Sequence, residues 1–419
     1  MTYEERSRAT LDRALQECPF YEAWRVFDPG PTAGVEARYA ALPVLTKADI
    51  RRHFPDGFVP RGLDWRRALA AGDLELVQTS GSTAEQVTNF WDQRWWDASE
   101  QASWPIHPAT RQWATGRHRE AILASSRSVG PVSDGPDLSL HDRRLGRFLF
   151  LNEKTDPGLW QEHHVHRMLR ELADYRPEVL EANPSYLWRL CRFAHERGLA
   201  VAPPRVVVLT FERPLAHHLH WIRLALDCPL VSSYGSTELG YVFMQCGQGR
   251  FHQNSGYCRV DFETLPGQPD ARLGRILVTT FHHPFCQILR FDPGDVVRLA
   301  VGSCTCGRYD GLTVEDIEGR RTQITRALDG RLVTLRQLDS ALAGLLGPEP
   351  YELEQVSAGD FFLRVETPAP ERSIVDGLRR LYGPDARIVL ERVPRIPPGP
   401  SGKFRHVFSR QPLEKAVSV

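Results

Sequence analysis

The chain has 419 residues, of which 42% are hydrophobic and 25% are charged, and its 52 Lys and Arg balance its 52 Asp and Glu. This is the composition of a folded globular protein with more than one core, and it excludes a disordered chain, a collagen-like repeat and a disulfide-stapled peptide. Because there is no basic excess, we expect neither nucleic acid nor an anionic membrane as a partner.

The compartment is indicated by the first residues and by the cysteines. Residues 1–8 are charged and do not resemble a signal peptide, and no apolar run is long enough to cross a bilayer. We therefore expect a cytoplasmic protein. In a reducing compartment its eight Cys are more typical of buried thiols or metal ligands than of disulfides.

Strand and helix patterns alternate through the middle of the chain. Short β-branched runs predict buried strands, and a 3.6-residue apolar period predicts helices between them. The strands are expected at 205–211, 229–234 and 275–281, and the helices at 165–175, 185–197 and 215–226. This alternation favours an α/β domain with a largely parallel sheet.

The pattern changes after about residue 320. A strand running into a helix is expected at 331–346, a hairpin at 351–366, a helix at 372–382 and a strand at 387–393, before a Pro/Gly-rich loop at 395–403. We therefore predict two domains, a large α/β domain over 1–318 and a small α+β domain over 319–419.

Several polar loops could carry chemistry. A loop of small hydroxyl residues, Thr79 to Thr83, follows an apolar run and is suited to phosphate oxygens, although it is equally a surface turn. A second loop, Tyr234 to Glu238, offers an aromatic face, a glycine and a carboxylate suited to Mg²⁺. Asp295 could accept from ribose hydroxyls, and Lys403 could contact phosphate or carboxylate. Walker A, H-E-x-x-H and G-x-S-x-G motifs do not occur in the chain.

In this order along the chain, the loops resemble motifs of the adenylate-forming superfamily of acyl-CoA synthetases, and most closely its phenylacetate-CoA ligase-like branch. The resemblance implies a large α/β adenylate-forming domain, a small mobile C-terminal domain, and a hinge at Gly319 and Arg320. It implies that a carboxylic acid, aryl or apolar, is activated with ATP and Mg²⁺ as its acyl-adenylate and then passed to the thiol of CoA. A homodimer is left open.

The resemblance also assigns roles to residues. Lys403 would be the catalytic lysine, Glu238 would hold Mg²⁺, Asp295 would bind ribose, and Arg320 would lie at the nucleotide. The phosphate loop would be Thr79, Ser80, Gly81, Ser82 and Thr83, and the adenine motif would be Tyr234, Gly235, Ser236 and Thr237.

Two departures from the family pattern leave alternatives open. The phosphate loop continues as Ala84-Glu85-Gln86, without the usual Gly and Pro, and the hinge continues as Arg321-Thr322-Gln323, without acidic residues. The acceptor could then be a carrier protein or an amine in place of CoA. A degenerate member that binds nucleotide or acid without catalysis is the other alternative.

Cys246, His252, Cys304 and Cys306 supply three thiolates and one imidazole, a set suited to tetrahedral zinc. Cys258 or Cys286 could replace one ligand, and four unliganded loop residues are the alternative. Since members of the resembled branch carry a similar Cys/His arrangement, we expect a structural zinc ion.

Three further features receive other interpretations. The histidines of 162–166 and 217–220 are predicted to lie on solvated helix faces, not in metal sites. The aromatic stretch 90–96 is interpreted as core packing, with an aryl pocket as the alternative. Glu212 matches a family position near the acyl and nucleotide pockets, and a carboxylate at a helix N-terminus is the other interpretation.

Overall fold

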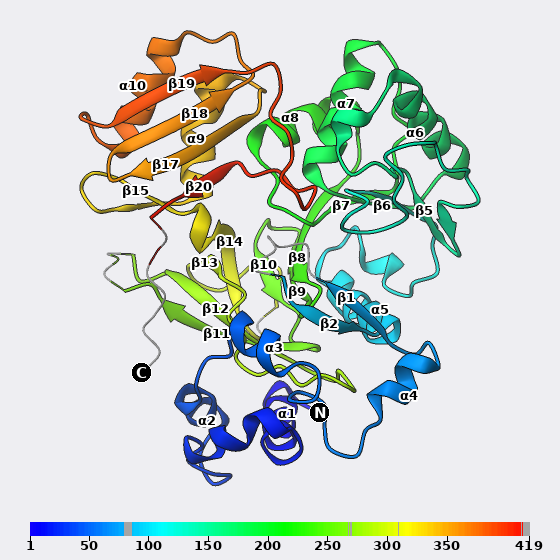
Figure 1. The fold of residues 1–419 in the computed structure, drawn as a ribbon, viewed down its shortest axis with the longest axis vertical. Helices are drawn as coiled ribbons and strands as arrows, with labels where there is room; N and C mark the ends of the chain where they lie inside the picture. The colour runs from blue at the N-terminus through cyan, green and yellow to red at the C-terminus, as the bar shows by residue number, and fades with distance from the viewer. Residues whose placement is uncertain (79–85, 267, 269, 309, 412, 414–419) are drawn as a thin grey trace. The chain divides into compact units, whose positions relative to one another are not determined.

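The computed structural model describes residues 1–78, 86–266, 268, 270–308, 310–411 and 413 (Figure 1). The chain forms two compact units. The first unit comprises 1–117, 233–266 and 270–316, and the second comprises 118–232, 267–269 and 317–419. Each is described by itself below. Among the described residues, no helix combines the length and the apolar character that a bilayer crossing requires.

The first unit begins with short helices and continues into an antiparallel sheet. Its helices are α1 (Tyr3–Glu17), α2 (Val35–Ala41), α3 (Lys47–His53), α4 (Trp65–Ala70) and α5 (Gln93–Ser103). Its strands are β1 (Glu75–Gln78), β2 (Thr88–Trp91), β9 (Gly240–Gln245), β10 (Phe251–Gln253), β11 (Cys258–Thr264), β12 (Leu273–Thr280), β13 (Asp295–Leu299) and the start of β14 (Thr313–Arg320). A capping box between Thr2 and Glu5 starts α1, whose face with Leu11, Ala14 and Leu15 is buried.

The second unit contains the parallel strands and the helices that separate them. Its strands are β3 (Glu120–Leu123), β4 (Arg144–Leu145), β5 (Phe148–Phe150), β6 (Val179–Ala182) and β7 (Val206–Leu209), with the start of β8 (Leu230–Ser236). Its helices are α6 (Glu162–Tyr175), α7 (Pro184–Glu196) and α8 (Ala216–Ala225). Leu169, Leu187, Val207 and Ile222 belong to one buried core, so helices and strands share it.

The C-terminal part of the second unit has a sheet of its own, in the order β19-β18-β17-β20. Its elements are β15 (Thr325–Arg326), β16 (Leu332–Val333), α9 (Leu335–Leu346), β17 (Tyr351–Ser357), β18 (Asp360–Val365), α10 (Glu371–Tyr382), β19 (Arg387–Arg392) and β20 (Val407–Ser409). This sheet, orange to red in Figure 1, packs with α9 and α10 around a core that includes Leu342, Leu363 and Leu378.

The predicted α/β fold with an α+β C-terminal part is confirmed, and each predicted helix and strand is present. The largely parallel sheet is confirmed only in part. Strands β3, β5, β6, β7 and the start of β8 are parallel, whereas β8 to β12 pair antiparallel with their neighbours. The physical reason lies in the connections. Helices α6 to α8 provide crossovers between parallel strands, but among the described residues of the first unit no helix follows β8, so β8 and β9 can join through a tight turn.

Candidate active site and metal centre

Two of the nucleotide-binding residues predicted from the sequence meet in the first unit. Tyr234 lies on β8 and Asp295 is the first residue of β13, and the Tyr234 hydroxyl donates to Asp295 Oδ2 over 2.7 Å. The turn before Asp295 is fixed by Gly294, whose φ of 87° favours glycine and whose N–H donates to Asp292 Oδ1. The fold therefore joins two motifs that lie some sixty residues apart in the sequence, since this hydrogen bond spans 61 positions.

The turn after Tyr234 depends on a glycine. The strand is irregular between Tyr234 and Gly235, and a Cβ at Gly235 would lie 2.2 Å from the Gly240 carbonyl oxygen. Ser236, Thr237 and Glu238 follow, and all three are partly exposed. The Glu238 carboxylate thus lies in a turn that a ligand can reach, as a Mg²⁺ ligand would.

The predicted phosphate loop, residues 79–83, lies outside the described residues, together with Ala84 and Glu85. Its flanks are described. Strand β1 ends at Gln78, which pairs antiparallel with Thr88 at the start of β2. The two described flanks are therefore adjacent antiparallel strands.

Lys403 and Arg320 lie in the second unit. Gly402, with a φ of 75°, precedes Lys403, and its carbonyl accepts a hydrogen bond from the Tyr186 hydroxyl over 3.2 Å. Arg320 ends β14 after Gly319, whose φ is 108°, and the Arg320 N–H donates to the side chain of Gln323 over 3.0 Å. The unusual Gln323 thus caps the backbone at the predicted hinge.

The four predicted zinc ligands come together in the first unit. Cys246 follows β9, His252 lies in β10, and Cys304 and Cys306 lie in the loop between β13 and β14. One ligand atom from each lies within 4.8 Å of the others. The sulfurs of Cys246 and Cys304 are 3.8 Å apart, and Cys306 Sγ is 3.3 Å from His252 Nε2.

These spacings fit a tetrahedral ion. Zinc–sulfur bonds of about 2.3 Å at tetrahedral angles place two sulfurs about 3.8 Å apart. The second ring nitrogen of His252 lies 3.2 Å from the Thr313 hydroxyl, which leaves Nε2 to face the sulfurs. Burial and the charges of Arg308 and Arg250 lower the pKa of His252, so the ring is kept in the neutral form that binds metals.

Cys258 and Cys286 are not part of this cluster. Both are buried, and Cys258 Sγ donates to the Asn254 carbonyl over 3.5 Å. Burial raises the pKa of both thiols above their ordinary value. They are therefore core thiols, and the alternative ligand sets are wrong for this fold.

The aromatic stretch packs inside the first unit. Phe90 and Trp95 are buried, and the Trp95 indole donates to the Phe281 carbonyl over 2.9 Å. The core-packing interpretation is confirmed for these two side chains.

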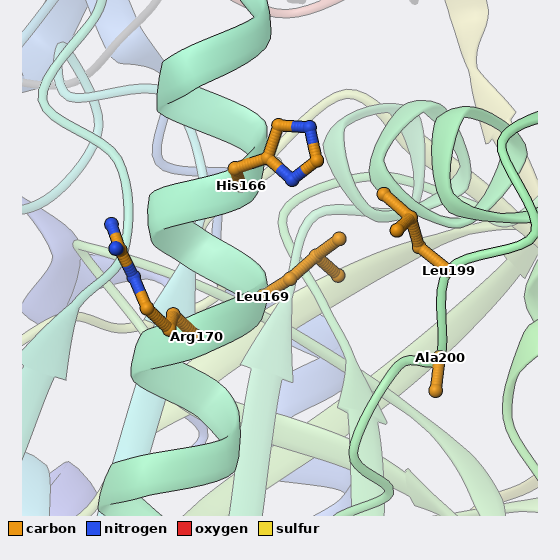
Figure 2. A pocket seen from close by; sticks show the side chains of 5 residues that line it. All are labelled: His166, Leu169, Arg170, Leu199 and Ala200. Atoms are coloured by element: carbon orange, nitrogen blue, oxygen red, sulfur yellow. The ribbon is translucent and has the colours of Figure 1, made fainter.

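A shallow hollow of about 470 Å³ lies on the surface of α6 in the second unit (Figure 2). Its lining residues are His166, Leu169, Arg170, Leu199 and Ala200. This hollow is lined neither by Lys403 nor by any residue predicted to bind the nucleotide or the acid.

Sequence analysis missed the burial of His217 and His218, which are 3% and 0% exposed. The predicted solvated face is therefore wrong for these two residues, and it is also wrong for His164, which is 4% exposed. A signal was present: His218 stands three residues after the buried Leu215 and four before the buried Ile222, so all three share one helix face.

The comparisons agree with this geometry. No protein-family model matches the chain. The chain is 24% identical to the phenylacetate-coenzyme A ligase of Thermus thermophilus, over 97% of its own length and 95% of that protein.

Solved structures show the same fold. A 2-hydroxyisobutyryl-CoA ligase in complex with 2-HIB-AMP matches with a TM-score of 0.68 and 16% identity, over 93% of this chain and 85% of that one. An anthranilate CoA ligase in complex with anthranoyl-AMP matches with a TM-score of 0.51 and 12% identity, over 79% and 66%.

The fold is that of the adenylate-forming CoA ligases, as the motifs predicted. The full-length likeness in sequence is to a phenylacetate-CoA ligase.

Proposed function

We propose that this chain is an AMP-forming acid–thiol ligase that activates a carboxylic acid as its acyl-adenylate and transfers the acyl group to CoA. The observation that carries the proposal is the near full-length likeness to a phenylacetate-CoA ligase. Aryl or other apolar acids are the substrate class that this likeness favours.

The chemistry explains what such a site must do. A carboxylate is a poor electrophile because its leaving group would be oxide. Attack of the carboxylate oxygen on the α-phosphorus of ATP releases pyrophosphate and installs AMP as the leaving group. The thiol sulfur of CoA then attacks the acyl carbon, AMP departs, and the thiol proton goes to solvent. Positioning two anions and offsetting their charge is the main demand on the protein.

The motifs suggest roles for the residues within this proposed function. Tyr234 and Asp295, already hydrogen bonded to each other, would contact adenine and ribose. The 79–83 loop would hold the β- and γ-phosphates, Arg320 would lie near the nucleotide, and Lys403 would supply positive charge to the reacting oxygens. Glu238 would hold Mg²⁺, which neutralises phosphate charge when bound.

We also propose that residues 319–419 form the mobile domain that carries Lys403, with the hinge at Gly319 and Arg320. A separate sheet supports this boundary, as does a hydrophobic core whose residues, apart from Leu215, all come from 327–407. The Gln323 side chain accepts a hydrogen bond from the Arg320 N–H. This contact would restrain the hinge.

A structural zinc ion is proposed at Cys246, His252, Cys304 and Cys306. Four protein ligands leave no open position, so the ion would stabilise the fold and take no part in the reaction.

One alternative is adenylation followed by transfer to a carrier protein or an amine, for which the altered hinge sequence at Thr322 and Gln323 leaves room. A degenerate binding protein remains the other alternative, and the homodimer and the cytoplasmic location remain predictions.

The test is incubation of the purified protein with ATP, Mg²⁺, CoA and a panel of aryl and aliphatic acids, with AMP and acyl-CoA measured together. We expect equal amounts of AMP and acyl-CoA with at least one acid. AMP without any thioester would point to another acceptor, and no AMP with any acid would contradict the ligase function.

A further inference from the structure

A buried group of titratable side chains in the second unit is not part of the nucleotide or zinc sites. Glu212 follows β7, His217 and His218 lie in the first turn of α8, and His406 immediately precedes β20. One polar atom each from Glu212, His218 and His406 lies within 4.8 Å of the others. His217 stacks edge-on against His218 with 4.1 Å between ring centroids.

The hydrogen bonds of the rings show which nitrogens carry protons. His218 Nδ1 accepts from the Leu215 N–H over 3.1 Å, so Nε2 carries the proton and donates to the Ser185 hydroxyl over 3.2 Å. His406 is hydrogen bonded to the backbone of Tyr351, and its buried Nε2 makes no hydrogen bond within the described part of the chain. His406 therefore has a lone pair on Nε2, whereas His218 does not.

This arrangement does not suit a metal ion. The only His218 nitrogen that faces the group is protonated, and a metal needs an unprotonated imidazole nitrogen. Arg189 and Lys403 add positive charge nearby, since both act on the Glu212 carboxyl. The group is suited to proton sharing.

Glu212, like His406, has a buried polar atom without a hydrogen-bond partner among the described residues. Its Oε1 accepts from the Ser185 N–H at the start of α7 over 3.1 Å, and its buried Oε2 has no partner among the described residues. Burial raises the pKa of Glu212, although the Ser185 hydrogen bond and the charges of Lys403 and Arg189 act in the opposite direction. A protonated Glu212 has one hydrogen to donate, and His406 Nε2 lacks a donor.

His406 stands three residues after Lys403, and the segment between them is anchored. The Gly402 carbonyl accepts from the Tyr186 hydroxyl, and a Cβ on Gly402 would collide with Ser125. Phe404 is buried and lies against the Arg189 guanidinium, 4.0 Å from its ring centre. A contact at His406 would complete this anchoring on the C-terminal side of the lysine.

We propose that Glu212 donates its carboxyl proton to Nε2 of His406, and that this buried hydrogen bond positions the backbone that carries Lys403 for adenylation. A carboxylate oxygen of Glu212 lies within 4.8 Å of a ring nitrogen of His406, and rotation of the carboxyl would bring the two groups to hydrogen-bond length. The inference rests on the proposed ligase function for its role, but not for its geometry.

The groups that face His406 come from every element packed against it. They are Glu212, His217, His218, Tyr351 and Arg189. Glu212 alone among them offers a carboxyl proton. Glu212 and His406 are positioning residues in this account, since neither is assigned contact with the reacting atoms.

The geometry is tested without activity, by nitrogen NMR of the full chain labelled with ¹⁵N-histidine. We expect the His406 signals to stay those of a neutral ring from pH 8 to pH 5.5, with an Nε2 resonance that moves in Glu212→Ala and returns toward wild type in Glu212→Gln, whose amide can donate to Nε2. A His406 ring that titrates near pH 6.5, or an Nε2 resonance that ignores Glu212→Ala, would overturn the proposal. Either result stands whether or not the chain proves to be a ligase.

The role is tested by kinetics of acid-dependent pyrophosphate release. His406→Phe and Glu212→Ala should each lower kcat about 10-fold, the effect of about 1.4 kcal/mol, with KM for the acid unchanged, and Glu212→Gln should recover most of the loss. His220→Asn, which changes an exposed histidine on the same helix, is the matched control and should match wild type. Equal effects of Glu212→Gln and Glu212→Ala, or a rise in KM with kcat intact, would show that the pair does not position the lysine.

Discussion

Two groups of histidines and acidic or thiol side chains, one in each unit, look alike in composition and differ in chemistry. Around His252, Nδ1 lies beside the Thr313 hydroxyl and Nε2 faces the cysteine sulfurs. Around His218 the ring proton itself points into the group, toward Ser185. The first arrangement suits a metal ion and the second suits proton sharing, so the hydrogen-bond partner of each histidine ring bears on what its cluster can do.

The largest effect is expected when a ligand of the first cluster is replaced. Cys304→Ser should remove zinc and destabilise the protein by about 4 kcal/mol, or roughly 10 °C in melting temperature, because structural zinc contributes directly to folding. Elemental analysis and thermal unfolding of protein purified without chelators measure both.

Cys228→Ser is the matched control, since Cys228 is a partly exposed thiol outside the cluster. It should keep the full metal content. Wild-type protein without zinc would remove the distinction between the two clusters.

The next effect concerns the lysine beside the second cluster. Lys403→Ala should slow acid-dependent pyrophosphate release about 100- to 1000-fold, or about 3 to 4 kcal/mol, because a charge aimed at the transition state is lost. Transfer from a chemically supplied acyl-adenylate should be nearly unchanged, as measured by thioester formation.

Arg405→Ala removes a neighbouring exposed positive charge and controls for a general loss of charge in the loop. Equal slowing of both half-reactions by Lys403→Ala would mean that the lysine is structural.

A smaller effect follows from the pKa of His406, which burial lowers to about 4. Between pH 6.5 and pH 4 the unfolded chain binds a proton at this position and the folded chain does not, so the free energy of unfolding must fall as the pH falls. At pH 5 one such histidine lowers the free energy of unfolding by about 2 kcal/mol.

Urea unfolding at pH 7 and pH 5 measures this contribution to the free energy of unfolding. The loss of stability between the two pH values should be smaller in His406→Phe than in wild type by about that amount, and it should be unchanged in His141→Asn, whose ring is 98% exposed. An identical pH dependence in His406→Phe would mean that His406 is not kept neutral.

The smallest effect lies at the nucleotide site. Tyr234→Phe keeps the aromatic ring but removes the hydrogen bond to Asp295, so KM for ATP should rise roughly fivefold, corresponding to about 1 kcal/mol. Steady-state kinetics with varied ATP measures this rise. Tyr175→Phe, which removes a hydroxyl bonded to the Arg147 carbonyl, should leave KM for ATP unchanged.

Sequence patterns predicted the parts of this molecule that depend on local periodicity. Helix α7 and strand β7 were predictable because apolar residues repeat at 3.6 positions in one and run without interruption in the other. The metal cluster was predictable as a set because only a few residue types bind zinc, although the sequence could not exclude Cys258 or Cys286.

What the sequence could not predict depends on contacts between distant segments. The antiparallel pairing of β8 with β9 follows from a tight turn that needs Gly235 against the Gly240 carbonyl. The burial of His217 and His218 follows from packing against Trp188 and His406, and a histidine's polarity favours the opposite prediction. The Glu212 carboxyl meets the N-terminus of α7, not that of its own following helix.

Formation of an acyl-adenylate is the step on which the proposed function depends, and isotope exchange between pyrophosphate and ATP tests it without any acceptor. With Mg²⁺ present and CoA absent, we expect labelled pyrophosphate to enter ATP only when a suitable carboxylic acid is added, and Lys403→Ala to abolish the exchange. Absence of exchange across a broad panel of acids, with protein that is folded and binds ATP, would contradict the proposed function.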